Sequence, residues 1–367
     1  MRNILGDNLT ITLFGESHGE VVGAVLDGVA PGILVDHDFI KAQLTKRRPT
    51  KKIETARVEA DEYKIVSGVF NGYTTGAPLT IIIPNTNTNS KDYEKNKNLA
   101  RPSHADYVAH VKYDGYNDYR GGGHFSGRIT AAIVAAGAII QKALMDKGIF
   151  IGTHILKCGN VVDSCFNDCL EEVKILQNKN FPVINDVESL MREEIENYAI
   201  NHNSIGGILQ TAVVGMPVGV GEEWFSSVEG KIANACFSIG GIKGIEFGKG
   251  FGFAELSGKD ANDSFYFGNE TVKTSTNHNG GINGGLTNGM PIIFNCAVKP
   301  TPSIGLPQKT IDFEKMENVE IQINGRHDPA IIRRMAVVVD TLTAIVIADL
   351  LTIRFGRDYL KKWDMVY

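Results

Sequence analysis

RPSHADYVAHVKYDGYNDYRGGGHFSGR, which occupies residues 101–128, is the stretch around which the chain is organised. It combines arginines, histidines and a run of glycines, namely Arg101, Arg120, Arg128, His104, His110, His124, Gly121, Gly122 and Gly123. Glycine runs can turn backbone N–H groups toward an anion, and arginines hold phosphate or carboxylate by two-point contacts. Histidine exchanges protons near neutral pH. The stretch therefore indicates a site for an anionic small molecule with proton transfer. The alternative is a glycine-rich loop with solvated charges.

The composition of the 367-residue chain is that of a globular protein, with 43% hydrophobic and 22% charged residues. The length allows two or three domains or one large one. A net charge of −5 argues against a general nucleic-acid surface. The N-terminal segment has no secretory signal, so we expect a cytoplasmic protein whose five cysteines are reduced thiols.

Two long apolar runs predict core helices and no membrane span. Residues 129–140 are shorter than the ~20 residues that a spanning helix needs, and the run over 336–351 contains Asp340 and Asp349. We expect the helices to cover residues 129–144 and 333–354. The spacing of Cys158, Cys165 and Cys169 lacks the paired form of a zinc site, so no metal is expected.

Alternating and turn-bounded patterns predict an α/β (α+β) chain. The expected strands are 9–14, 21–26, 64–70, 79–83, 150–156, 208–214, 243–248 and 291–298. The further expected helices are 36–46, with Asp36 or Asp38 as the N-cap, and 231–239. Residues 84–98 read as a mobile loop that could act as a lid. Strands, a glycine-rich loop and a long apolar helix occur in both halves. We therefore expect one domain over 1–367, built of two similar halves, with a peripheral helical segment near 163–204.

Further motifs lie outside the central stretch. They are GESHG (15–19), the basic RRP (47–49), TNHNGGINGG (276–285), KPTPS (299–303) and GRHDP (325–329). Taken alone, His18 could be a structural histidine, and the basic cluster could be a solvated charge run. Taken together with RPSHAD (101–106), the motifs resemble the chorismate synthase family, in the family's order and over about residues 1–355.

The resemblance implies a fold and a reaction. The fold would be a β-α-β sandwich of two four-stranded antiparallel sheets packed together and flanked by helices. The reaction would be the last common step of the shikimate pathway, in which 5-enolpyruvylshikimate 3-phosphate loses phosphate by trans-1,4 elimination to give chorismate. The cofactor would be reduced FMN, with no net redox change. The resemblance also implies a homotetramer, and a separate flavin reductase or other reductant, with no nucleic acid or membrane partner.

The resemblance also assigns residues to the site. The proton-transfer residues would be His18, His104 and Asp328. The substrate, which carries two carboxylates and a phosphate, would be held by Arg47, Arg48, Lys52, Arg101, Arg128 and Arg326. The flavin would contact His124, Phe125, Ser126, Gly240, Gly241, Gly284, Lys299, Pro300, Thr301, Pro302, Ser303 and Arg326.

The sequence departs from the family pattern at several of these positions. His124-Phe125 stands where arginine and serine are usual, Gly240-Gly241 where asparagine and alanine are common, and Lys52 where many members have a second arginine. One alternative is a flavin oxidoreductase that consumes NADPH, although the chain lacks a strand–GxGxxG–helix unit for the dinucleotide. The other is a module that binds an anionic metabolite without catalysis.

Overall fold

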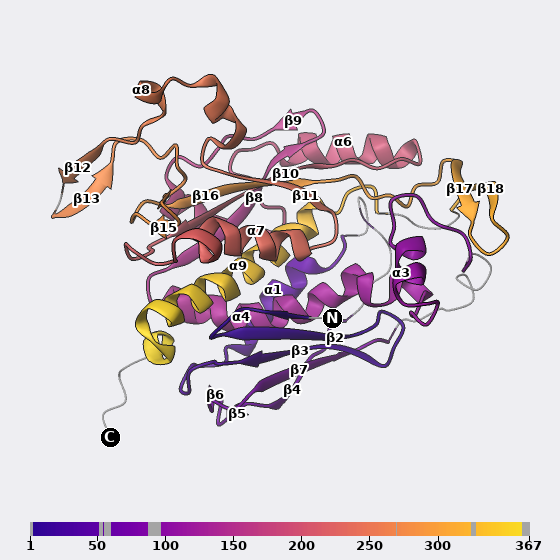
Figure 1. The fold of residues 1–367 in the computed structure, drawn as a ribbon, viewed down its shortest axis with the longest axis horizontal. Helices are drawn as coiled ribbons and strands as arrows, with labels where there is room; N and C mark the ends of the chain where they lie inside the picture. The colour runs from indigo at the N-terminus through magenta and orange to yellow at the C-terminus, as the bar shows by residue number, and fades with distance from the viewer. Residues whose placement is uncertain are drawn as a thin grey trace.

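Two antiparallel sheets with a layer of helices between them form the described part of the chain (Figure 1). The computed structural model describes residues 3–50, 54, 60–86, 97–268, 270–323 and 328–361. The predicted site residues Lys52 and Arg326 lie outside the described residues, as do residues 87–96 of the loop that could act as a lid.

The first sheet is built from the N-terminal part of the chain. Its strand order is β1-β2-β3-β7-β4, and every neighbouring pair is antiparallel. The strands are β1 (Ile4–Leu5), β2 (Thr10–Gly15), β3 (Val21–Asp27), β4 (Lys64–Ser67) and β7 (Leu79–Pro84). Alternate residues of β7 are fully buried, so one face of this sheet is covered by the core.

The second sheet is built from the rest of the chain. Its order is β11-β16-β10-β8-β9, again with antiparallel neighbours only. The strands are β8 (Phe150–Cys158), β9 (Val161–Val162), β10 (Gly207–Val214), β11 (Ile242–Phe247) and β16 (Ile292–Val298). The two central strands, β10 and β8, are buried along most of their length, which suits a sheet covered on both faces.

Two apolar helices, α4 (Thr130–Asp146) and α9 (Ile332–Phe355), run between the sheets (Figure 1). Each is apolar on nearly all sides, so each needs protein around its whole circumference. α4 packs on β3 and β7, α9 packs on β8 and β10, and the two helices pack on each other. Both are long and apolar enough to cross a membrane, but 78% and 94% of their apolar windows are buried inside the protein, as in core helices.

The helix α1 (His37–Arg47) belongs to the same layer, and its last turn carries the basic residues Lys46 and Arg47. Its N-cap is Asp36, one of the two predicted candidates, because the Asp36 carboxylate accepts a hydrogen bond of 2.9 Å from Phe39 N. The helix ends at Arg47, and Arg48 already has an extended backbone.

The remaining elements lie around this frame. The helices are α3 (Asp106–Lys112), α5 (Cys169–Leu176), α6 (Glu188–Ile200), α7 (Val228–Ser238) and α8 (Gly258–Ala261). The 3-10 turns are η1 (Arg120–Phe125), η2 (Gly127–Ile129), η3 (Trp224–Ser226), η4 (Gly250–Glu255) and η5 (Arg357–Leu360). The short strand pairs are β5 (Val69–Phe70) with β6 (Tyr73–Thr74), β12 (Phe265–Gly268) with β13 (Thr271–Thr274), β14 (Ile282–Asn283) with β15 (Leu286–Thr287), and β17 (Gln308–Asp312) with β18 (Glu317–Ile321).

The predicted α+β sandwich of two antiparallel sheets is confirmed, with two differences in detail. Each sheet has five strands, because the two-residue strands β1 and β9 extend its edge. The sheets are also not packed directly together, because α4 and α9 separate them (Figure 1). An apolar helix gains more burial between two sheets than on an outer face, so the middle layer is its favourable place.

Candidate active site

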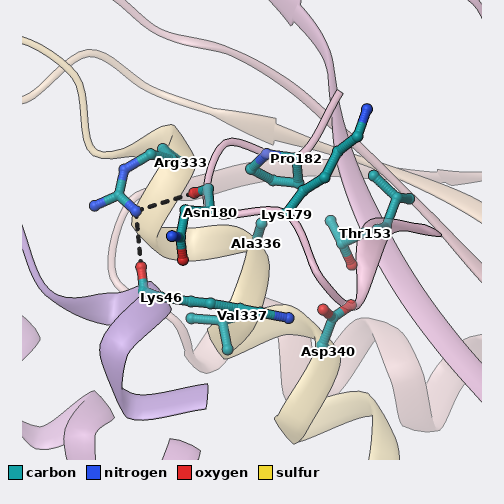
Figure 2. A pocket seen from close by; sticks show the side chains of 10 residues that line it. Lys46, Thr153, Lys179, Asn180, Pro182, Arg333, Ala336, Val337 and Asp340 are labelled. Carbon is teal, nitrogen blue, oxygen red and sulfur yellow. Dashed lines mark hydrogen bonds between the residues drawn. The ribbon is translucent and has the colours of Figure 1, made fainter. Parts of the chain in front are cut away.

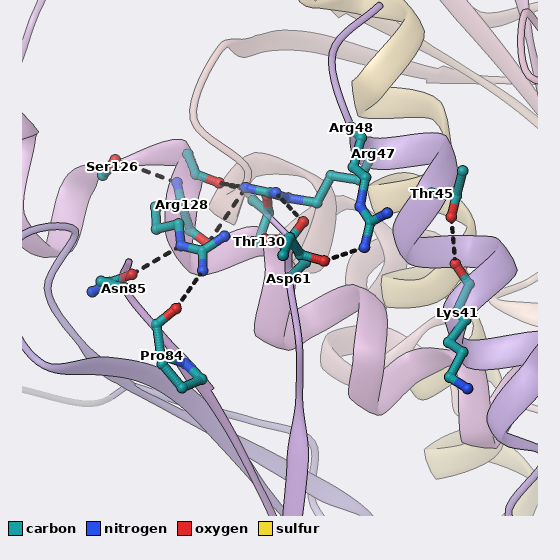
Figure 3. Close-up of polar contacts among 12 residues, drawn as sticks. Lys41, Thr45, Arg47, Arg48, Asp61, Pro84, Asn85, Ser126, Arg128 and Thr130 are labelled. Carbon is teal, nitrogen blue, oxygen red and sulfur yellow. Dashed lines mark hydrogen bonds and ion pairs between the residues drawn. The ribbon is translucent and has the colours of Figure 1, made fainter. Parts of the chain in front are cut away.

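Arg47 and Arg128 meet at one carboxylate, that of Asp61 (Figure 3). Nη1 of Arg47 donates to Asp61 Oδ2 at 3.0 Å, and Nη1 of Arg128 donates to Asp61 Oδ1. Arg47 stands at the end of α1, whereas Arg128 lies in η2 and is only 7% exposed. Two cations around one anion leave a local positive charge, which suits an anionic ligand.

Both guanidinium groups are also fixed by the segment after the glycine run and by the end of β7. Arg47 donates through Nε to Thr130 Oγ1 and through Nη2 to the carbonyl of Gly127, each at 3.0 Å. Arg128 donates through Nε to Asn85 Oδ1 at 2.9 Å and through Nη2 to the carbonyl of Pro84 at 3.1 Å. The cations are therefore held in place before any ligand arrives, which lowers the entropy cost of binding.

His18 packs against the glycine run. Its Nδ1 lies 2.9 Å from Ser17 Oγ, and Ser17 N donates to the carbonyl of Gly123 at 3.1 Å. Gly121 has a φ of +59°, and a Cβ at this position would lie 2.3 Å from Cε1 of His18. The glycine is thus required both by the backbone conformation and by the approach of the imidazole.

Asn85 links the turn that carries His18 to Arg128. Its side-chain amide donates to the carbonyls of Glu16 at 2.9 Å and Gly19 at 2.8 Å, while its Oδ1 accepts from Arg128. The structure therefore brings together three predicted site residues, His18, Arg47 and Arg128, through Asn85 and Asp61. Neither linking residue was predicted. The only sequence signal for Asn85 is its place as a polar residue directly after a strand.

His104 belongs to a second group, which contains the KPTPS motif. Its Nε2 lies 2.7 Å from Ser303 Oγ, and Lys299 Nζ donates to the carbonyl of Ser103 at 3.0 Å. Arg101 makes a two-point contact with Asp106, at 2.8 and 2.7 Å. Burial lowers the pKa of His104 to about 4, with the positive charges of Arg101 and Lys299 acting in the same direction and Asp106 opposing them. His104 is therefore neutral near pH 7 without a ligand.

The predicted flavin-contact residues that the structure describes lie on four segments, 124–126, 240–241, 284 and 299–303. His124 Nδ1 is 2.7 Å from the carbonyl of Gly15, the ring of Phe125 is half exposed, and Ser126 caps η2 by accepting from Arg128 N at 3.3 Å. The carbonyl of Gly241 accepts from Lys299 N at 2.9 Å, which ties the second glycine pair to the KPTPS motif.

Gly240 and Gly284, two of the predicted flavin-contact glycines, have open space on the side where a side chain would project. No atom lies within 4 Å of the position that a Cβ would take at Gly240 or at Gly284. Between the two ends of the KPTPS motif, Thr301 Oγ1 is buried and has no hydrogen-bond partner among the described residues. A flat, polar ligand could approach the backbone at such positions and satisfy that hydroxyl, so these residues fit a flavin nucleotide.

Asp328 lies in a third group, just before α9 begins. Its Oδ2 accepts from Nη2 of Arg334, and Nε of Arg334 is 3.9 Å from Glu54 Oε1. Glu54 also pairs with Arg333. Arg48, the neighbour of Arg47, donates through Nη2 to the carbonyl of Ala60. Among the residues that the structure describes, no group of three or more His, Cys, Asp or Glu side chains could hold a metal ion.

Comparison with known proteins agrees with the fold and identifies the family. Residues 9–352 match the family described as chorismate synthase. The chain is 44% identical to the chorismate synthase of Thermococcus gammatolerans over 361 residues, which is 98% of this chain and 99% of that protein. It is 45% identical to the chorismate synthase of Pyrococcus abyssi over 349 residues, or 95% and 97% of the two chains. A crystal structure of chorismate synthase superposes with a TM-score of 0.75 at 26% identity and covers 96% of this chain and 94% of that one.

These matches first define the class of protein, which is an enzyme, a carbon–oxygen lyase. The chain belongs to the chorismate synthase family, whose reaction is the last common step of the shikimate pathway.

Proposed function

We propose that this chain converts 5-enolpyruvylshikimate 3-phosphate to chorismate and phosphate with reduced FMN as its cofactor. The observation that carries the proposal is the convergence of Arg47 and Arg128 on Asp61, beside the turn that carries His18. A substrate with two carboxylates and a phosphate needs several fixed cations, and here they are held in advance. Family membership supports the same reaction.

In the elimination, the bond from C3 to the phosphate oxygen breaks and a proton leaves C6. Arg47 and Arg128 bind anionic groups of the substrate and orient the ring, with Arg48, Arg101, Lys52 and Arg326 assigned to the same task. His18 donates a proton to the leaving phosphate, and Asp328 accepts the proton from C6. The reduced FMN that these residues would hold would supply transient electron density for the elimination, with no net redox change.

The flavin would be held by the two bare glycines, Gly240 and Gly284, and by the KPTPS motif. Thr301 Oγ1 lacks a partner among the described residues, and Ser303 places His104 beside the same segment. His104 is assigned to the anionic edge of the reduced ring, where the negative charge would raise its lowered pKa and draw a proton onto the imidazole. His124, Phe125 and Ser126 are assigned to the same ligand.

The source of reducing equivalents is assigned to a separate flavin reductase or another reductant. Both main sheets are antiparallel throughout their described strands, whereas a dinucleotide-binding unit is built on parallel strands. Steady oxidation of NADPH by the isolated chain would contradict this assignment.

The assembly is proposed to be a cytoplasmic homotetramer of single-domain chains, each built of two similar halves. The hairpin β12–β13 projects from the body of the protein (Figure 1), and Phe265 and Phe267 on it are 61% and 78% exposed. Trp224, Phe225 and Phe251 are 84%, 99% and 85% exposed. Large exposed apolar side chains of this kind favour a partner surface. Light scattering of the purified protein measures the mass, and a monomer would contradict the proposal.

The reaction itself is tested with purified protein, reduced FMN and 5-enolpyruvylshikimate 3-phosphate under anaerobic conditions. Formation of chorismate, read by its absorbance, is expected. As a matched control, Arg192→Ala removes an arginine that forms an ion pair with Glu188 on α6, where no proposed site residue lies, and it should leave turnover unchanged. Absence of turnover with FMN shown to be bound would refute the proposed function.

A further inference from the structure

Glu54 and Arg333 form a buried ion pair at the junction of α1 and α9. Nε of Arg333 donates to Glu54 Oε1 at 2.7 Å, and Nη2 donates to Oε2 at 2.6 Å. The two side chains are 1% and 2% exposed. A buried pair of this geometry is costly to desolvate and on balance contributes little to stability. Its presence at this junction is therefore better explained by what the two side chains hold in place.

Arg333 uses its remaining donors on the end of α1. Nη2 donates to the carbonyl of Arg48 at 2.5 Å. Nη1 donates to the carbonyl of Lys46 at 2.9 Å and to that of Asn180 at 3.1 Å (Figure 2). The last carbonyls of a helix have no partner within the helix, and a cation is favourable there. Arg333 therefore fixes the point at which the chain leaves α1.

The same exit point decides where Arg47 lies. Arg47 stands between the two residues whose carbonyls Arg333 holds, and its own side chain turns to Asp61 and Thr130 (Figure 3). A shift of the Lys46 and Arg48 carbonyls would carry the Arg47 backbone with it and would pull the guanidinium away from Asp61.

Glu54 is also connected to the proposed proton acceptor, Asp328, through Arg334. Its Oε2 accepts from Thr50 N at 2.6 Å and from Thr50 Oγ1 at 3.1 Å, which holds the chain just after Arg48. Its Oε1 lies 3.9 Å from Nε of Arg334, the residue that binds the carboxylate of Asp328. The Glu54 carboxylate thus contacts Arg333, which holds the carbonyls on either side of Arg47, and lies beside Arg334, which binds Asp328.

We propose that Glu54 and Arg333 are positioning residues that set the placement of Arg47 and of Asp328 together. The inference rests on the proposed function, because it concerns how well the substrate is held and how well its proton is accepted. Neither residue touches the substrate. Loss of the pair should raise KM through Arg47 and lower kcat through Asp328, and a displacement of about 1 Å at such groups can cost roughly 10²-fold in kcat/KM.

The sharpest test separates stability from positioning. The double variant Glu54→Leu with Arg333→Met replaces the pair with apolar side chains of similar volume, which proteins often tolerate without loss of stability. It removes the contacts to Thr50 and to the carbonyls of Lys46 and Arg48. We expect a melting temperature close to that of the wild type, a higher KM, a lower kcat, and faster hydrogen exchange of the backbone amides that follow α1. Unchanged kinetics in a folded double variant would overturn the proposal.

Glu54→Gln gives an independent measurement if the double variant does not fold. It keeps the size of the side chain but removes the charge that holds Arg333 and Arg334, so KM and kcat should move in the same directions. Calorimetry of substrate binding to the protein with oxidised FMN provides a readout that needs no turnover, and weaker substrate binding with unchanged FMN affinity is expected. Unchanged substrate binding and kinetics in Glu54→Gln would overturn the proposal as well. Arg192→Ala serves as the control, and turnover by the wild type shows first that the proposed function itself holds.

Discussion

His104 and Ser303 are joined by a contact of 2.7 Å between Nε2 and Oγ, although 199 residues separate them in the chain. The contact brings the segment that opens the central stretch against the KPTPS motif. It also fixes the imidazole by one of its ring nitrogens, so the orientation of His104 depends on a residue of the opposite half of the chain.

The lowered pKa of His104 predicts proton uptake when an anionic ligand binds. The pKa is about 4 in the ligand-free protein, so the ring is neutral at pH 6 to 7. A negative charge placed beside it favours the protonated form and raises the pKa. Binding of reduced FMN should therefore draw protons from the buffer, which calorimetry detects as a binding enthalpy that depends on the ionisation enthalpy of the buffer. His104→Gln should bind with smaller uptake, and equal uptake in both proteins would contradict the prediction.

Replacing His104 with alanine should affect turnover more than affinity. Its proposed partner is the negative edge of the reduced flavin and not an anionic group of the substrate, so its loss should affect the chemical step more than the hold on the substrate. We expect kcat to fall by ~10²–10⁴-fold, the usual contribution of an acid–base group. The substrate dissociation constant should change little. Steady-state kinetics together with calorimetry measure both quantities, and a parallel loss of rate and affinity would argue for a binding role instead.

Arg128→Ala should weaken substrate binding. The substitution removes one of the two cations on Asp61 and leaves the carboxylate with Arg47 alone. A hydrogen bond to a charged group is worth about 1.5–3 kcal/mol, or roughly 10–100-fold in KM. Arg128→Lys keeps the charge but not the planar fork, so it should recover only part of the affinity. Arg192→Ala is the control for the general loss of an arginine.

Asp340 should make the protein less stable as the pH rises from about 4 to about 7. Burial raises its pKa from 3.8 to about 7, against the effects of Thr153 and Lys46. The folded protein then binds this proton more tightly than the unfolded chain, so the free energy of unfolding falls between a pH of about 4 and a pH of about 7. Lys46 from α1, whose pKa burial lowers, points toward Asp340 in this pocket, whereas Lys179 and Arg333 line the pocket with their charged ends turned away from the carboxylate (Figure 2).

Asp340→Asn tests this by removing the titrating group while keeping its size. Relative to the wild type, the variant should gain stability as the pH rises across that range, as measured by urea denaturation at a series of pH values. A constant difference between the two proteins at all pH values would show that Asp340 does not titrate there.

Gly137→Ala should destabilise the protein by forcing the two central helices apart. A Cβ at Gly137 on α4 would lie 2.4 Å from the carbonyl oxygen of Thr341 on α9 and 2.7 Å from its Cβ. Overpacking of a core costs about 1–3 kcal/mol. Gly258→Ala on α8 is the matched control, because no atom lies within 4 Å of its added Cβ and its φ is not positive. Denaturant midpoints compare the variants, and equal midpoints would contradict the prediction.

Local features of the fold could be predicted from the sequence because their causes are local. The helix predicted over 36–46 and its cap at Asp36 follow from periodicity and from a short polar side chain, and both match the structure, in which the helix covers His37–Arg47. The edge strands β1 and β9 could not be predicted, because each is only two residues long, which is too short to show the alternating pattern of a strand. The central position of α4 and α9 depends on tertiary packing, which the apolar runs suggest but do not specify.

The site could be predicted only as far as motifs identify it. His18, Arg47 and Arg128 were predicted, but Asp61 and Asn85, which hold two of them, were not. Their roles depend on distances between segments that are remote in the sequence. Glu54 and Arg333 give an even weaker signal, since an acid near a basic run and an arginine at a helix start are ordinary surface patterns.

The helix α9 is the last long element of the described chain and also the one most enclosed by it. During synthesis, both sheets leave the ribosome before the segment that must lie between them. Until then the inner face of the second sheet and the side of α4 that packs on α9 lack their cover, and a nascent chain in that state is prone to aggregate or to need a chaperone. A fragment that stops before Ile332 should therefore accumulate as insoluble material, however well its individual strands form.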